Sequence, residues 1–178
     1  MDEKVRTTRD GATVTVTLCN PAKRNALSLD VLHSLIDAFR AAGESDATGI
    51  VLAAEGPVFS AGHNFGEMKG ASFEDAHELF TVCSSLMQMM HTVPQPIVAR
   101  VHALATAAGC QLVASCDLAV AARSASFAIP GGKGGLFCHT PLVAVARKSK
   151  CRSTTSVGMP SIEGGTACSG AVGPFLST

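Results

Sequence analysis

The stretch PQPIVARVHALATAAGCQLVASCDLAVAA, residues 94–122, contains the pattern that decides the fold class. Residues 97–103 are mostly apolar and partly β-branched, which predicts a strand. Small residues from 105 to 109 then lead into apolar residues at helical spacing, which predicts a helix. Residues 118–122 form another short apolar run and predict a second strand. A strand, a helix and a strand in succession are typical of an α/β fold with largely parallel strands.

The rest of the chain continues this alternation. Strands are predicted at 12–19, where Thr alternates with Val and Leu, at the apolar run 49–54, and at 126–130. One helix is predicted after Ser28, a candidate N-cap, and another over about 73–91, where the prolines of TVPQP end it. We therefore expect an α/β domain.

The composition indicates one globular domain and argues against several kinds of partner. The chain has 178 residues, of which 47% are hydrophobic and 16% charged, as expected for a single well-buried domain. Its 14 basic and 14 acidic residues balance, so charge gives no reason to expect binding to nucleic acid or an anionic membrane. The six histidines lack metal-ligand spacing, so no metal site is predicted. The apolar run 97–122 is interrupted by polar residues and predicts a buried core rather than a membrane span.

The cysteines and the first residues bear on the cellular compartment. The seven cysteines form no CxxC pair and their number is odd, which favours reduced, structural thiols inside the cell. The opening MDEKVRTTRD has neither the apolar segment of a secretory signal nor the acid-poor, Arg- and Ser-rich character of a transit peptide. We expect a cytoplasmic protein, with a mitochondrial one as the alternative if a transit peptide is missing from this sequence.

Residues 149–178 differ in kind from the rest. Ser, Thr, Gly and Pro supply 17 of these 30 residues, and no apolar period runs through them. Such a segment buries too little apolar surface to offset the entropy cost of ordering it. We expect a core over 1–148, followed by a poorly ordered tail.

Two junctions between a loop and a helix are candidates for chemistry. They are FSAGHNF, residues 59–65, and ATAAGCQ, residues 105–111. The first amides of a helix have no acceptor within the helix and lie in positive potential. One amide from each junction, converging on one oxygen, would make an oxyanion hole, and small side chains would let a ligand approach the backbone.

Four stretches carry a resemblance to a known family. NPAKRNALS (20–28), AEGPVFSAGHNF (54–65), the opening stretch (94–122) and FAIP with GLFC (127–138) occur in the order and spacing of the crotonase, or enoyl-CoA hydratase/isomerase, superfamily. The sequence is most similar to the enoyl-CoA hydratase domain-containing subgroup. The resemblance covers about residues 10–148. It implies a spiral of ββα units, acyl-CoA thioester substrates, no cofactor beyond the coenzyme A of the substrate, and trimers or hexamers.

The resemblance also assigns site residues. It places the two amides of the oxyanion hole on His63 and Ala108, and it places Gln111 and Gly131 where hydratases have their two catalytic glutamates. The positions expected to contact the substrate or its coenzyme A are Lys23, Arg24, Ala26, Ala61, Gly62, Asn64, Phe65 and Pro130.

These residues predict altered chemistry. Neither Gln111 nor Gly131 can carry a proton, and such a general acid or base typically contributes about 10²–10⁴ in rate. Weak catalysis is expected, of a kind that depends on enolate stabilisation, such as decarboxylation or thioester hydrolysis. Gln111 either binds a water or ligand or is satisfied by the backbone, and the His63 imidazole and Glu67 are minor candidates for acid–base work.

Two other functions stay open at this point. One is a non-catalytic acyl-CoA-binding or assembly partner, and the other is an inactive truncated product. The resemblance fades at VAVARKSK, residues 143–150, where the family continues into a helical region that completes the trimer contacts and the acyl pocket. We therefore expect the C-terminal part of the fold to be missing or replaced.

Overall fold

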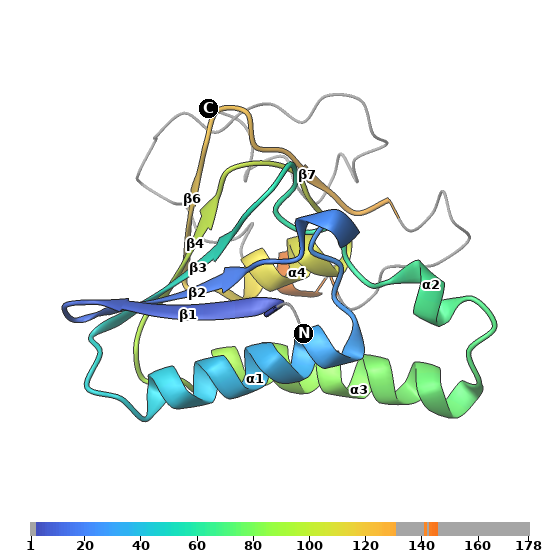
Figure 1. Cartoon of the computed structure of the whole chain (residues 1–178), viewed down its shortest axis with the longest axis horizontal. Helices are drawn as coiled ribbons and strands as arrows, with labels where there is room; N and C mark the ends of the chain where they lie inside the picture. Colours follow the sequence, from blue (N-terminus) through green and yellow to red (C-terminus); the bar gives the residue numbers. More distant parts are fainter. Residues whose placement is uncertain (1–2, 131–140, 142, 146–178) are drawn as a thin grey trace.

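The computed structural model describes residues 3–130, 141 and 143–145, and within them the predicted α/β class is confirmed. The main sheet has the spatial order β1-β2-β3-β4-β6 (Figure 1). β1 and β2 form an antiparallel hairpin, and β3, β4 and β6 continue the sheet parallel to β2. The strand bounds are Val5–Asp10, Thr13–Leu18, Gly49–Ala54, Ile97–Val101 and Leu118–Ala121.

The sequence patterns predicted every strand of this sheet except β1. Within VRTTRD the side chain of Val5 is buried and the other five are exposed. β1 lies at the edge of the sheet and is held by its backbone pairing with β2, so its sequence carries almost no apolar signal.

Two long helices lie side by side along one side of the main sheet (Figure 1). They are α1 (Leu29–Gly43) and α3 (Phe73–Met90). Ser28 occupies the predicted N-cap of α1, but its hydroxyl bonds the Asp30 carboxylate instead of a helix amide. α3 begins with a reciprocal capping box between Ser72 and Asp75.

Three further helical elements are short. They are the 3₁₀ turn Pro21–Lys23, α2 (Phe65–Met68) and α4 (Ala108–Ser115). All eight residues of α4 are buried, as a helix without a polar face must be. Within the described residues, no helix is long and apolar enough to span a bilayer.

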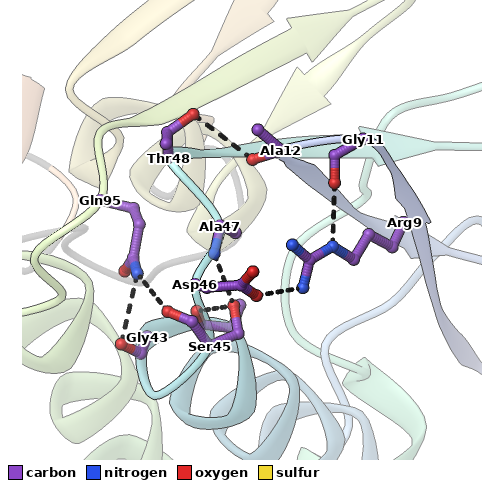
Figure 2. A network of polar contacts seen from close by, with 10 residues as sticks. Arg9, Gly11, Ala12, Gly43, Ser45, Asp46, Ala47, Thr48 and Gln95 are labelled. Atoms are coloured by element: carbon purple, nitrogen blue, oxygen red, sulfur yellow. Dashed lines mark hydrogen bonds and ion pairs between the residues drawn. The ribbon is translucent and has the colours of Figure 1, made fainter.

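The connection from α1 to β3 is fixed by polar contacts (Figure 2). The Gln95 amide nitrogen donates to the carbonyls of Gly43 and Ser45, both at 3.3 Å. Arg9 bonds the Asp46 carboxylate from the β1–β2 hairpin. These contacts join the end of α1, and the start of the connection that follows it, to β1 on one side and to the segment before β4 on the other.

Candidate functional site

The segments that the sequence analysis selected lie next to one another as a second, small parallel sheet. Its strands β5 (Ala105–Thr106) and β7 (Phe127–Ala128) pair directly. Single parallel bridges join Ser60 to Ala105 and Leu27 to His63. Residues about 35 to 45 apart in the chain thus become neighbours, and the two candidate amide loops share one backbone framework.

Gly62 brings the first loop against the start of α4. Its φ is +84°, and a Cβ atom there would lie 2.9 Å from the Ala107 Cβ, 3.0 Å from the Thr106 carbonyl oxygen and 3.2 Å from the Ala108 nitrogen. Only glycine fits both this backbone angle and this space. The residue before His63 therefore touches the residue whose amide the sequence analysis selected.

Gly109 makes the reciprocal contact from α4. A Cβ atom there would lie 2.7 Å from both the Cβ and the carbonyl oxygen of Ser60 and 2.8 Å from its Oγ. Ser60 is fully buried, and its hydroxyl donates to the Asn25 carbonyl at 2.8 Å. The hydroxyl is therefore a packing group, and the two loops interlock at 62 against 107–108 and at 60 against 109.

The N-terminus of α4 begins at a strained residue. Ala107 is the N-cap and has φ +50° and ψ −122°, a backbone conformation that non-glycine residues rarely adopt. Its amide donates to the Ala128 carbonyl at 2.9 Å. Ala108 is the first residue of the helix, so its N–H is one of the amides that a helix leaves without an acceptor in its own backbone.

Gln111 lies one turn into α4. Its side chain is only 6% exposed, and among the described residues nothing donates a hydrogen bond to its Oε1. Among the described residues, the backbone does not satisfy this oxygen. A buried carbonyl oxygen without a donor is costly, which makes Gln111 a candidate ligand-binding group.

His63 is held at the edge of the small sheet. Its Nδ1 lies 3.4 Å from the Leu27 carbonyl oxygen, to which it donates when the ring proton is on Nδ1. The Phe80 ring meets the imidazole edge to face, with ring centroids 5.2 Å apart. The imidazole is half-buried and well positioned, and it stays a minor candidate for proton transfer.

The loop predicted to contact coenzyme A is partly brought to the same place. Lys23 and Arg24 are exposed, and the Arg24 carbonyl accepts from the Ala61 amide at 3.0 Å. Ala26 is half-buried beside them. Two cationic side chains thus stand in solvent next to the first amide loop, where they are free to pair with phosphates.

The remaining predicted contacts are more scattered. Asn64 is the N-cap of α2, where its side chain accepts from the Gly66 amide at 3.0 Å. Phe65 is 64% exposed, and Pro130 is exposed at the end of the described core. Gly131, the Glu67 side chain and the tail 149–178 lie outside the described residues.

A cavity of about 280 Å³ lies between the start of α1, α2 and α3. Its lining contains none of the predicted site residues; it consists of Leu29, Met68, Ala71, Asp75, Ala76, Glu78 and Leu79. In the part of the chain that is described, no three His, Cys, Asp or Glu side chains gather as a metal site requires.

Asn25 is the organising residue that the sequence analysis did not single out. It is buried, its Nδ2 donates to the carbonyls of Glu55 and Val58 at 2.8 and 3.0 Å, and its Oδ1 accepts from the Asn20 amide at 2.9 Å. It thereby joins the loop after β2 to the loop after β3. Its left-handed φ of +50° suits asparagine, which gave a weak sequence signal.

Known proteins are similar to this chain over most of its length. Residues 8–150 match the family model described as enoyl-CoA hydratase/isomerase. Over 134 residues the chain is 54% identical to the rat protein named "Enoyl-CoA hydratase domain-containing protein 3, mitochondrial" and 52% identical to its human counterpart. These alignments cover 74% of this chain, and 45% and 44% of the two relatives.

Solved structures show the same fold. The crystal structure of human enoyl-CoA hydratase domain-containing protein 3 has a TM-score of 0.79 and 45% identity, and an enoyl-CoA hydratase from Mycobacterium smegmatis has 0.79 and 46%. In both comparisons 82% of this chain and 58% of the other are covered. The chain spans about half the length of the curated relatives it matches.

Proposed function

The chain belongs to the enoyl-CoA hydratase/isomerase family, and on that premise we propose that it binds acyl-CoA thioesters. The thioester carbonyl oxygen would lie between the backbone N–H groups of His63 and Ala108. Lys23 and Arg24 would face the phosphates of coenzyme A, with Ala26 and Ala61 lining the nucleotide.

One observation carries this proposal, the contact of Gly62 with the start of α4. A Cβ atom on Gly62 would be 3.2 Å from the Ala108 nitrogen, so the residue adjoining His63 stands at the second amide. The positive end of α4 adds to the attraction for a developing oxyanion. Each donor of such a pair is typically worth roughly 10²–10³ in rate.

The proposal includes slow or absent hydration. Gln111 carries an amide and Gly131 has no side chain, so neither can replace a glutamate as a proton carrier. Where a reaction occurs, it should need enolate stabilisation more than a base, as decarboxylation and thioester hydrolysis do. A Gln111→Glu, Gly131→Glu variant that gains no crotonyl-CoA hydration while still binding coenzyme A would contradict this explanation.

The names of the curated relatives bear on the cellular location of this chain. The word "mitochondrial" in the names of the rat and human relatives favours the mitochondrial alternative for this chain. The cytoplasmic location and the trimeric or hexameric state stay predictions.

The direct experiment follows the thioester carbonyl itself. Butyryl-CoA labelled with ¹³C at the carbonyl is bound to the full chain, and its infrared band is compared with the free ligand. We expect a shift to lower frequency, because two N–H donors weaken the C=O bond. A thermal-shift titration with coenzyme A and crotonyl-CoA measures binding independently, and no shift with either ligand would contradict the proposal.

Two glycine variants make a matched pair for this experiment. Gly62→Ala places a methyl group between the loops. In Gly11→Ala the alanine has to adopt a comparable positive φ, +53°, but nothing lies within 4 Å of the new Cβ. We expect the carbonyl band shift to be lost in Gly62→Ala and kept in Gly11→Ala. Loss in both variants, or in neither, would argue against a hole formed by these loops.

A further inference from the structure

A single buried side chain joins the loop after β2 to the loop after β3. Asn25 is 1% exposed, and its Nδ2 donates to the carbonyls of Glu55 and Val58 at 2.8 and 3.0 Å. Its Oδ1 accepts from the Asn20 amide at 2.9 Å. Both ends of the side-chain amide are therefore bonded, one to its own loop and the other to the loop that faces it.

The backbone around Asn25 makes two further bonds to the loop after β3. The Arg24 carbonyl accepts from the Ala61 amide at 3.0 Å, and the Asn25 carbonyl accepts from the Ser60 hydroxyl at 2.8 Å. The Ser60 hydroxyl in turn accepts from the Gly62 amide at 3.3 Å. These contacts reach the residue directly before the first amide of the proposed oxyanion hole.

The direction of the two carbonyls depends on a pair of left-handed residues. Arg24 and Asn25 have φ angles of +52° and +50°. Such angles are uncommon outside glycine, and asparagine tolerates them better than most residues because its short amide can bond the nearby backbone. The bond from the Asn20 amide is of this local kind. The Asn25 side chain thus stabilises both the turn and the contact between the loops.

We propose that Asn25 is a positioning residue that sets where the His63 amide stands relative to the thioester oxygen. This inference rests on the proposed function. Because Lys23 and Arg24 directly precede Asn25, the residues proposed to bind phosphates and the loop proposed to polarise the carbonyl form one hydrogen-bonded unit. In this role Asn25 acts through Ser60 and contacts no reacting atom.

Comparison of two ligands separates this role from a general effect on stability. Coenzyme A and butyryl-CoA share the nucleotide and its phosphates, and only butyryl-CoA has the thioester carbonyl. The ratio of their affinities, measured by calorimetric titration of the full chain, therefore depends on the hydrogen bonds to that carbonyl. Partial unfolding weakens the binding of both ligands equally and leaves the ratio unchanged.

Two variants weaken the proposed unit. Asn25→Gly tolerates the positive φ and removes the side-chain bonds. We expect the ratio of butyryl-CoA affinity to coenzyme A affinity to fall roughly 2- to 10-fold, the value of about one hydrogen bond. The ¹³C carbonyl band of bound butyryl-CoA should also move back toward that of the free ligand. Ser60→Ala removes only the hydroxyl and should change both quantities in the same direction.

Gln95→Ala is the matched control. Gln95 is also a buried amide whose nitrogen donates to two backbone carbonyls, those of Gly43 and Ser45, both at 3.3 Å. It precedes β4, which runs parallel to β3, so it lies at the opposite end of the sheet from the loop after β3. The affinity ratio and the carbonyl band should keep their wild-type values in this variant.

The outcomes distinguish the inference from the proposed function. A wild-type ratio and band in folded Asn25→Gly, verified by circular dichroism, would overturn the inference alone. If Asn25→Gly does not fold, the same result in Ser60→Ala overturns it. An equal fall of the ratio in Gln95→Ala would do so too, because the effect would not be specific to these loops. A wild-type chain that binds neither ligand would overturn the proposed function as well.

Discussion

Gly109→Ala separates the packing of the two amide loops from the stability of the helix that holds one of them. In an ordinary helix this change is stabilising, because alanine exceeds glycine in helix propensity by about 0.8–1.0 kcal/mol. At position 109 the new methyl group meets Ser60. Its distances to the Cβ, the carbonyl oxygen and Oγ of Ser60 would be 2.7, 2.7 and 2.8 Å.

The expected magnitude follows from how little Ser60 can move. The residue has no exposed surface, its carbonyl accepts from the Thr106 amide at 3.0 Å, and its hydroxyl donates to Asn25. Overpacking costs about 1–3 kcal/mol, and three contacts below 3.0 Å place this site at the upper end. Subtracting the gain in helix propensity leaves a net loss of about 2 kcal/mol in the free energy of unfolding.

Urea unfolding followed by far-ultraviolet circular dichroism measures this loss, since the chain contains no Trp or Tyr for fluorescence. Gly43→Ala is the control, because it also lies in a helix and its Cβ would make an ordinary 3.4 Å contact with Val93. The control should be neutral or stabilised by up to about 1 kcal/mol. If Gly109→Ala matches or exceeds wild-type stability, the interlocking of the loops is not as described.

Three other changes test the strain and the charges of the fold. Ala107→Gly should raise the free energy of unfolding by about 1 kcal/mol. The reason is that relief of the strained backbone, about 1–3 kcal/mol, exceeds the cost of the added freedom of the unfolded chain, about 0.5–1 kcal/mol. A lower urea midpoint than that of the wild type would contradict this prediction. Burial raises the pKa of the Cys83 thiol to about 11 and that of Cys110 to about 12. The folded state keeps these thiol protons, so their stabilising effect is present below pH 9 and is lost as the pH rises to about 11–12. In a Cys83→Ala, Cys110→Ala variant, the urea midpoint should therefore fall less steeply as the pH rises through this range. A hydrogen bond from Lys4, and to a smaller extent one from Ser28, lowers the pKa of Asp30. The stabilising effect of the Asp30 carboxylate is therefore lost as the pH falls through that lowered pKa, and Asp30→Asn should make the urea midpoint depend less on pH in acid.

Local patterns predicted most of the main sheet and the long helices. β3 has the bounds that its apolar run predicted, and α3 ends one residue before the predicted end. These elements bury a regular face, so their periodicity is visible in the sequence. Phe80 of α3 is 37% exposed, and its ring meets the His63 imidazole edge to face.

Of the small sheet, local patterns predicted a strand only at 126–130, where β7 forms, and not at β5. The sheet pairs residues 105–106 with 127–128, and isolated bridges beside it join residue 27 to 63 and residue 60 to 105. Segments this short have no period, and the contacts depend on where the large sheet delivers its loops. The positions of the two amides stay a prediction from the resemblance to the family, whereas the glycine contacts that bring the loops together required the structure.

The two loops interlock through backbone and glycine positions and not through the side chain at position 111. Gly62 touches the start of α4, and Gly109 touches the loop that contains Gly62, so this contact depends on backbone and on the absence of side chains. Gln111 lies one turn further and takes no part in that contact. A substitution at position 111 therefore changes a side chain that lies outside the contacts between the loops. Under the proposed function, binding of the thioester and transfer of a proton would therefore depend on different residues.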